Sequence, residues 1–208
     1  MDETEKLIKR AQTGDSEAFE TLMAPLEKRV YGLALRITNN REDAFDCTQE
    51  TMLRAFRSIT DYRFQGAFTT WVFRITTNVC LDMIRRRRIK PYISLELMQD
   101  SGFTFSDKSS NPLDEIIRDD LNQDLKVCIS KLPLDQRVIV ILRDIQGLAY
   151  EDIAAILKIS LGTVKSRLSR ARERIRKMMY RRHGTNLEEL NSSRGVNYVR
   201  KENHTDDL

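Results

Sequence analysis

Apolar residues recur along most of the chain at the spacing of an α-helix, which predicts an all-α protein. One long helical period runs through residues 7–37, interrupted by a glycine near its start. Asn40 can cap a second helix, and Asp43 three residues further on completes the capping pair. A third period covers residues 68–88, with core positions at Phe68, Trp71, Val72, Ile75, Val79 and Met83. Residues 1–90 are therefore expected to form a small helical bundle.

The helical pattern stops between residues 91 and 112, where Ser, Gly, Asn and Pro dominate. Long stretches without secondary structure are uncommon inside compact domains, so this stretch is predicted to be a flexible linker. Helical spacing resumes in residues 113–182, which predicts a second helical domain. Residues 183–208 show no period and are expected to form a polar, disordered tail. The chain is thus predicted to hold two small helical domains joined by a linker.

A short helix, a turn and a basic helix follow one another in the second domain. The short helix is predicted over residues 150–157, with inward positions at Ile153, Ala154 and Leu157. Ser160 suits the N-cap of the next helix, which has nine Lys or Arg and one acid between Thr163 and Arg182. Its periodicity separates a narrow apolar stripe from an outward face with Lys165, Ser166, Ser169 and Arg170. This is the pattern of a helix-turn-helix whose second helix enters a DNA major groove.

The distribution of charge agrees with two domains that face nucleic acid. The 208 residues carry a formal net charge of +4. Residues 1–90 contribute +3 and residues 113–182 contribute +5, whereas the linker and the tail carry −2 each. A basic helix can also lie in solvent or on anionic lipid, but lipid binding favours Trp, Phe or Leu on the apolar face, and this stripe is too small and too short of aromatics.

Several classes of protein are disfavoured by the composition. The three cysteines, Cys47, Cys80 and Cys128, are far apart in the chain and are expected to be buried as small apolar residues. With only two histidines, no metal or other cofactor is expected. Neither a signal peptide nor a membrane-spanning run is recognisable, so we expect a cytoplasmic protein. The absence of a glycine-rich phosphate loop and of a ligand constellation argues against an enzyme.

Three segments of the chain, residues 43–56, 64–88 and 132–177, carry a resemblance to one known family. Residues 132–177, LPLDQRVIVILRDIQGLAYEDIAAILKISLGTVKSRLSRARERIRK, resemble region 4 of the extracytoplasmic-function (group IV) sigma factors of bacterial RNA polymerase. Residues 43–56, DAFDCTQETMLRAF, resemble region 2.2, and residues 64–88, FQGAFTTWVFRITTNVCLDMIRRRR, resemble regions 2.3 and 2.4. The resemblance covers roughly residues 5–88 and 113–180, in the order of the family, and the joint occurrence is more specific than either motif alone.

The resemblance implies a dissociable subunit for transcription initiation and no covalent chemistry. Core RNA polymerase, through its β′ clamp helices and β flap, and promoter DNA are the implied partners. An anti-sigma factor that holds the protein inactive and a role in stress response are implied as well. Residues 1–90 would be region 2, which docks on the polymerase and recognises and melts the −10 element. Residues 113–182 would be region 4, which recognises the −35 element.

The same resemblance implies roles for individual residues. Those carried over to the −35 element are Thr163, Lys165, Ser166, Arg167, Ser169 and Arg170. Those carried over to the −10 element are Tyr62, Phe64, Trp71, Arg74, Asn78, Arg85, Arg86 and Arg87. Those carried over to the polymerase-docking face are Asp43, Asp46, Gln49 and Glu50. Aromatic rings can stack on bases of an opened strand while arginines hold its phosphates, which fits this division.

Two positions depart from the family pattern. The family often has Asp-Ala-Glu-Asp where this chain has Phe45 in the third place, which removes one charge from the docking helix. Ala149 stands where a Ser or Thr usually caps the first helix of the helix-turn-helix. Losing such a cap typically costs about 1 kcal/mol, so this helix depends more on packing.

An alternative function is a stand-alone helix-turn-helix regulator in which residues 1–88 serve as a dimerisation or sensor domain. Such a protein would bind duplex DNA as a two-fold dimer on spaced half-sites. The block at residues 62–88, rich in Phe, Trp and Arg, fits single-stranded DNA better. Trp71 itself lies on an apolar stripe and is interpreted primarily as a core residue.

Overall fold

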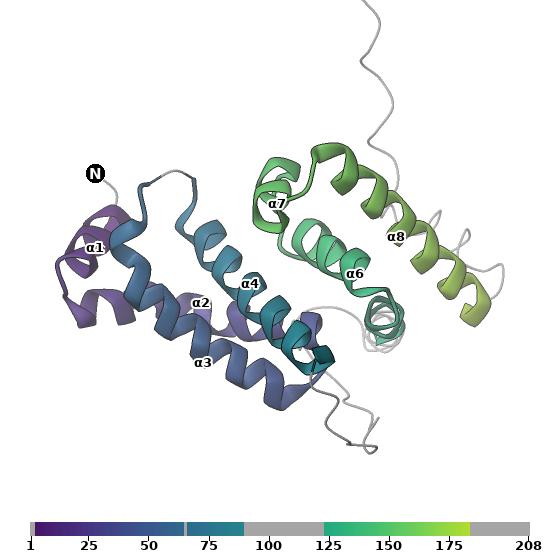
Figure 1. Cartoon of the computed structure of the whole chain (residues 1–208), viewed down its shortest axis with the longest axis horizontal. Helices are drawn as coiled ribbons and strands as arrows, with labels where there is room; N and C mark the ends of the chain where they lie inside the picture. Colours follow the sequence, from purple (N-terminus) through teal and green to yellow (C-terminus); the bar gives the residue numbers. More distant parts are fainter. Residues whose placement is uncertain (1–2, 65, 90–122, 184–208) are drawn as a thin grey trace, which may run out of the picture.

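The computed structural model describes residues 3–64, 66–89 and 123–183 (Figure 1). All regular secondary structure within these ranges is helical, which confirms the predicted all-α class. The predicted linker at residues 91–112, and the tail beyond residue 183, lie outside the described residues.

The first domain is a helical bundle. Its elements are α1 (Glu3–Gln12), α2 (Ser16–Thr38), α3 (Arg41–Ser58), the 3-10 turn η1 (Ile59–Asp61) and α4 (Phe68–Ile89). The long helix α2 packs against α1, α3 and α4, and α3 and α4 pack against each other (Figure 1). The bundle thereby exposes one flank of α3 and one flank of α4 to solvent.

Short-range hydrogen bonds decide where the helices of the bundle begin and end. The Asp15 side chain accepts a hydrogen bond from the Ala18 amide at 3.0 Å and so caps α2. Helix α2 ends at Asn39 in the left-handed conformation, with φ +58°. The Asn40 side chain accepts from the Asp43 amide at 2.9 Å, which confirms the predicted cap of α3.

The second domain contains the helix-turn-helix. Residues 123–130 are helical. They are followed by α6 (Leu134–Val140), the single π-helical turn η2 (Ile141–Ile145), α7 (Tyr150–Leu157) and α8 (Leu161–His183). The Ala149 backbone precedes α7 without a side-chain cap, as the sequence indicates. Gly147, with φ +73°, turns the chain from η2 towards α7.

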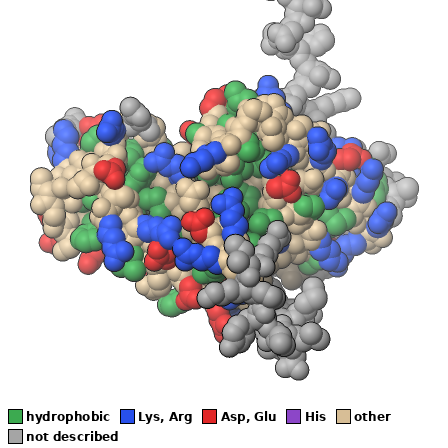
Figure 2. Space-filling model, viewed as in Figure 1, with side chains coloured by type: hydrophobic (Ala, Val, Ile, Leu, Met, Phe, Trp, Pro, Cys, Tyr) green, Lys and Arg blue, Asp and Glu red, His purple; other side chains and the backbone are tan. Residues whose placement is uncertain are grey.

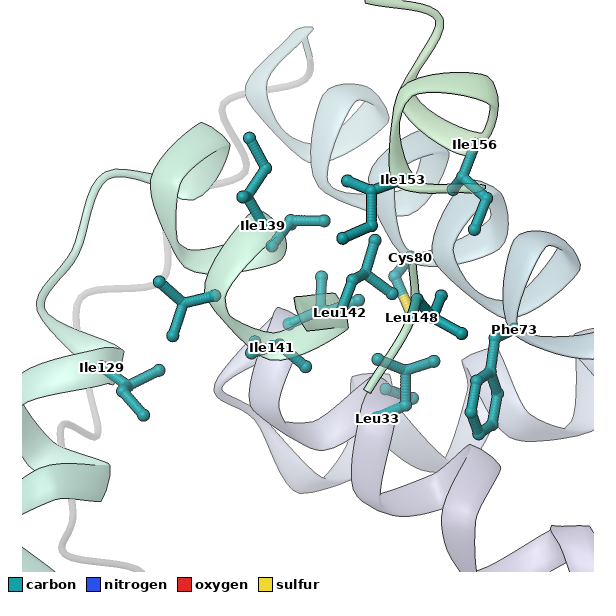
Figure 3. Close-up of a cluster of buried hydrophobic side chains, with 14 of the residues drawn as sticks. Leu33, Phe73, Cys80, Ile129, Ile139, Ile141, Leu142, Leu148, Ile153 and Ile156 are labelled. Carbon is teal, nitrogen blue, oxygen red and sulfur yellow. The ribbon is translucent and has the colours of Figure 1, made fainter. Parts of the chain in front are cut away.

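Buried apolar side chains form two clusters. The first lies inside the first domain and includes Ile8, Phe19, Leu22, Val30, Ile59 and Val72. The second crosses from one domain to the other (Figure 3). On the side of α2 and α4 it includes Leu33, Phe73 and Cys80. On the side of η2 and α7 it includes Leu142, Leu148, Ile153 and Ile156.

The two domains are therefore docked through a shared core. Helix α7 packs against α4, and α6 and η2 pack against α2. The Asn39 side-chain amide also donates to the Ser130 carbonyl at 3.2 Å across the contact. Docking explains why Ile156, absent from the inward set that periodicity predicts for α7, is only 3% exposed. The three cysteines are buried and free, as expected.

Candidate nucleic-acid interface

Helix α8 is held by its cap and by its apolar stripe. The Thr163 amide donates to the Ser160 hydroxyl at 3.1 Å, and the two hydroxyl oxygens lie 2.8 Å apart. This confirms the predicted N-cap. Val164, Leu168 and Ala171 are all buried against the second domain. This packing fixes the rotation of α8 about its own axis, so the opposite face points towards solvent.

The outward face of α8 offers cations that point to solvent. Lys165, Ser169 and Arg170 are exposed, and among the described residues no ion pair engages Lys165 or Arg170. Arg167 is different, because its guanidinium lies 3.5 Å from the Asp135 carboxylate of α6. The Thr163 carbonyl accepts from the half-buried Ser166 hydroxyl at 3.2 Å. The six predicted −35 residues thus share one end of α8, with Lys165 and Arg170 the most available.

The second half of α8 carries further arginines in ion pairs. Arg172 makes a bidentate contact with Asp144 of η2, at 3.2 and 2.7 Å. Arg182 lies 2.8 Å from Asp124. Figure 2 shows Lys and Arg side chains dense along the face of α8 and again over α3 and α4, where they alternate with acids. The Arg172 and Arg182 pairs tie α8 to the rest of its domain.

Four aromatic side chains gather where η1 leads into α4. The Tyr62 ring lies at the centre, with its centroid 5.2 Å from that of Phe64 and 5.5 Å from those of Phe68 and Trp71. Tyr62 and Trp71 are only 6% and 8% exposed, whereas Phe64 is 39% exposed. Tyr62 and Trp71 therefore form the base of the cluster and do not face solvent as DNA-contacting side chains would. Phe64 alone of the predicted aromatics reaches the surface.

The remaining predicted −10 residues lie along α4. Arg74 and Asn78 are exposed one turn apart on its outer flank. Arg85 is exposed as well, although it lies 3.6 Å from Asp82 one turn earlier. Arg54 of α3 approaches the same Asp82 carboxylate at 3.8 Å. Four of the predicted −10 residues are therefore exposed in a line that runs from the aromatic cluster along α4: Phe64, Arg74, Asn78 and Arg85.

The predicted docking residues on α3 separate into two groups. Asp46 and Gln49 are exposed, and Glu50 pairs with Arg54 at 2.7 Å. Asp43 does not belong with them, because its side chain is only 7% exposed and forms an ion pair with Arg87 of α4. The same pair engages Arg87, one of the cations expected at the −10 element. Asp43 and Arg87 together join the start of α3 to the end of α4.

The chain is similar to proteins of one family over both domains. Residues 22–89 match Sigma-70 region 2 and residues 122–175 match Sigma-70, region 4. The chain is 42% identical over 168 residues to the ECF RNA polymerase sigma factor SigE of Mycolicibacterium smegmatis, a match that spans 79% of this chain and 63% of that relative. It is 32% identical over 183 residues to the RNA polymerase sigma-H factor of Pseudomonas aeruginosa, spanning 86% of this chain and 95% of that one. The chain belongs to the extracytoplasmic-function sigma factors.

A solved sigma factor has the same fold. The sigma factor RpoE of Bartonella quintana, determined in complex with the anti-sigma factor NepR, superposes with a TM-score of 0.62 at 25% identity. The match covers 77% of this sigma factor and 96% of that chain. Sigma factors are transcription initiation factors that associate with RNA polymerase. From the residues matched, region 2 corresponds to the first domain here and region 4 to the second.

Three apolar residues on α3 of this sigma factor are exposed, and periodicity and charge did not predict their exposure. Phe45 is 58% exposed, Leu53 is 49% exposed and Phe56 is 45% exposed. Phe45 and Phe56 are three turns apart on nearly the same line of the helix, beside Asp46 and Gln49. A signal was present in the sequence, since Phe45 interrupts an otherwise acidic motif on the polar side of α3.

A groove of about 540 Å³ runs between α3 and α4 of the sigma factor. Its apolar lining comes from Val79 and Met83. Its charged lining includes Asp46 and Glu50 from the predicted docking face, Arg86 and Arg87 from the predicted −10 site, and also Arg54 and Asp82. Residues expected at the polymerase and at DNA therefore meet along one groove, and their charges alternate across it.

None of the helices that the described residues form has the length and apolar character needed to cross a membrane. Within the same ranges, His, Cys, Asp and Glu side chains form no group of three or more that could hold a metal ion.

Asp43 makes the stability of the sigma factor depend on pH in a defined direction. Burial raises the pKa of this carboxyl above its ordinary value of 3.8, and the Arg87 charge offsets only part of that effect. A raised folded-state pKa means that ionisation opposes folding, so the contribution of Asp43 to stability is present below pH 3.8 and is lost as pH rises through the raised pKa. We expect Asp43→Asn to remove this loss, as measured by urea unfolding of both proteins across the acid range.

The matched control for Asp43→Asn is Asp46→Asn, on the exposed side of the same helix. The free energy of unfolding of the native protein minus that of Asp43→Asn should fall with rising pH. A difference that rises with pH would mean that the attraction of Arg87 outweighs the burial of Asp43.

Proposed function

We propose that this sigma factor directs core RNA polymerase to promoters through three surfaces. Helix α8 reads the −35 element, Phe64 and the outer flank of α4 engage the −10 strand as it opens, and α3 docks on the polymerase. The observation that carries this assignment is the joint presence, in one chain, of the exposed cations Lys165 and Arg170 on a capped helix and of Phe64 exposed on a buried aromatic base.

Reading of the −35 element rests on the geometry at the start of α8. Lys165, Ser169 and Arg170 can face base edges in a major groove while Val164 and Leu168 hold the helix on its domain. Arg and Lys donate to the O6 and N7 atoms of guanine, and each good bidentate contact discriminates by about 1–3 kcal/mol. Thr163, Ser166 and Arg167 complete the proposed contact surface at its edge.

Engagement of the −10 element rests on the exposed ring of Phe64. A base turned out of the duplex can stack on this ring, and stacking on an aromatic side chain is worth about 1–3 kcal/mol per base. That is comparable to the few kcal/mol needed to unstack a base, so capture of one base can offset its extrusion. Arg74, Asn78, Arg85 and Arg86 are proposed to hold the phosphates and neighbouring bases of the displaced strand.

Docking on core polymerase is proposed for the exposed side of α3. Polar contacts come from Asp46, Gln49 and Glu50. Phe45 and Phe56 together add exposed apolar surface on the same helix. Stable interfaces combine an apolar centre with a polar rim, which this helix offers to the β′ clamp helices. The β flap is the proposed partner of region 4. An anti-sigma factor is proposed as an inhibitor because Bartonella RpoE was solved bound to one.

No covalent chemistry is assigned to the chain itself, because its proposed task is to position polymerase and open DNA. Its place of action is accordingly the cytoplasm, where core polymerase and the chromosome are found.

Run-off transcription tests the proposal directly. The reaction contains the purified protein, core RNA polymerase and a promoter from upstream of its own gene. A specific transcript that requires both protein and core is the expected result, and Phe64→Ala should reduce open-complex formation more than binding to the duplex −35 element. Tight two-fold binding to the same DNA without polymerase, and no transcript, would instead support the stand-alone regulator.

A further inference from the structure

The side chain of Gln12 links α1 to the backbone beneath Phe64. Its amide nitrogen donates to the Ile59 carbonyl at 3.0 Å and to the Tyr62 carbonyl at 2.8 Å. These two carbonyls lie about 50 residues away along the chain, at the start and at the exit of η1. One side chain therefore uses both of its N–H groups to hold the segment that leads to Phe64.

Contacts made by α1 and by the turn that follows it fix the position of Gln12. Ile8 and Ala11 on the same helix are buried in the core of the bundle. Across the turn that follows Gln12, Arg10 of α1 forms an ion pair with Asp15 at 2.7 Å, and Asp15 caps α2. The position of the Gln12 amide is thus set by the packing of α1 on α2.

A second hydrogen bond holds the backbone on the other side of Phe64. The Tyr62 hydroxyl donates to the Gly66 carbonyl at 2.7 Å. This hydroxyl is a neutral donor at physiological pH, and burial raises its pKa further above the ordinary value. Gly66 adopts φ +89°, a conformation that suits glycine.

Phe64 lies between these two attachment points in an unusual conformation. Its φ is +57°, the left-handed region that an aromatic residue seldom adopts. Such a conformation persists only where the surroundings determine it. The Tyr62 ring supports the Phe64 ring, but ring contacts alone do not select a backbone conformation. The hydrogen bonds from Gln12 and Tyr62 hold the backbone on both sides of Phe64.

We propose that Gln12, together with the Tyr62 hydroxyl, is a positioning residue for capture of a −10 base by Phe64. This inference rests on the proposed role of Phe64. The two residues act by holding the Phe64 backbone in its exposed, left-handed conformation before DNA arrives. Preorganisation of this kind favours a base that fits the held geometry over one that does not, so its loss should reduce discrimination at the −10 element.

The test compares Gln12→Glu and Tyr62→Phe with the native protein, each assembled with core polymerase. Gln12→Glu keeps the shape but replaces the donor by a carboxylate that repels both carbonyls, and Tyr62→Phe removes one oxygen. The readout is the ratio of open complexes, by 2-aminopurine fluorescence, on the preferred −10 sequence and on variants with one base changed. We expect this ratio to fall by about tenfold or more for Gln12→Glu, because the net effect of one lost hydrogen bond approaches tenfold and this variant loses two.

Two controls separate positioning from general stability. Thr13→Val removes a neighbouring hydroxyl that donates only to the Arg10 carbonyl at 2.8 Å, and it should leave the ratio unchanged. Gln12→Lys retains N–H donors of similar reach and should recover much of the discrimination lost in Gln12→Glu. A residue that only stabilised the fold would lower occupancy on all promoters alike and would leave their ratio as it was.

The outcomes distinguish this inference from the proposed function. If Phe64→Ala abolishes discrimination while Gln12→Glu and Tyr62→Phe keep it, Phe64 acts without these positioning residues and the inference is overturned. If Phe64→Ala also keeps full discrimination, the proposed role of Phe64 fails first. Should Gln12→Glu not fold, an unchanged ratio for Tyr62→Phe overturns the inference by itself.

Discussion

Replacing Arg170 by alanine is expected to lower transcription from a promoter with the preferred −35 element by about 10- to 100-fold, with much less effect once that element is scrambled. Arg170 is exposed on the outward face of α8 near its capped start, where it can reach base edges. Loss of a good base contact costs about 1–3 kcal/mol of discrimination. The measurement is run-off transcription, with the polymerase, on a matched pair of promoters that differ only at −35.

Two neighbouring arginines provide graded controls for Arg170→Ala. Arg174 is exposed one turn further along α8, and Arg174→Ala should weaken all promoters alike and reduce the salt slope by about one. Arg167→Ala should have a smaller effect on discrimination, because that guanidinium already lies 3.5 Å from Asp135. Equal losses on preferred and scrambled promoters for Arg170→Ala would show that the residue binds phosphate.

Introducing a carboxylate at Ile156 is expected to separate the two domains. Ile156 lies on α7, buried at 3% exposure in the core that the second domain shares with α4 (Figure 3). An unpaired charge enclosed in such a contact costs about 3–5 kcal/mol, and this cost is relieved when the domains separate and water reaches the carboxylate. We therefore expect Ile156→Asp to raise the radius of gyration measured by small-angle X-ray scattering while helicity by circular dichroism is retained.

The control for Ile156→Asp is Ile145→Asp, because Ile145 is 39% exposed at the end of η2 and can place a carboxylate in water. The −35 and −10 elements are separated by roughly 25 base pairs, or about 85 Å of duplex. Helices that share a core cannot span that distance, so the separated form should transcribe at least as well as the native protein. An unchanged radius of gyration, or loss of helicity together with the change, would contradict the prediction.

The local pattern of the sequence determined the helix-turn-helix and most of its orientation. Ser160 caps α8, and Val164, Leu168 and Ala171 recur at a helical spacing, so the outward face with Lys165 and Arg170 follows from neighbouring residues alone. The same is true of the turn between α2 and α3, where Asn39 and Asn40 end one helix and cap the next. Caps and periodicity act over three or four residues, which is why sequence reasoning finds them.

Burial by a partner element was decided only by the tertiary structure. Phe73 lies off the predicted stripe of α4, and Ile156 lies off that of α7, yet both are buried because the two domains cover each other. Exposed apolar residues are common, so periodicity cannot tell a solvated face from one covered by a distant helix.

Long-range polar contacts were decided in the same way. The sequence placed Asp43 on the docking face and Arg87 at DNA, whereas the fold pairs them across α3 and α4. It offered no reason to join Gln12 to the Ile59 and Tyr62 carbonyls, because those partners approach only when α1 packs beside η1. Residue types and spacing therefore determined the family and the faces of its helices. The packing of helices determined which of those charged and aromatic side chains remain exposed at the surface.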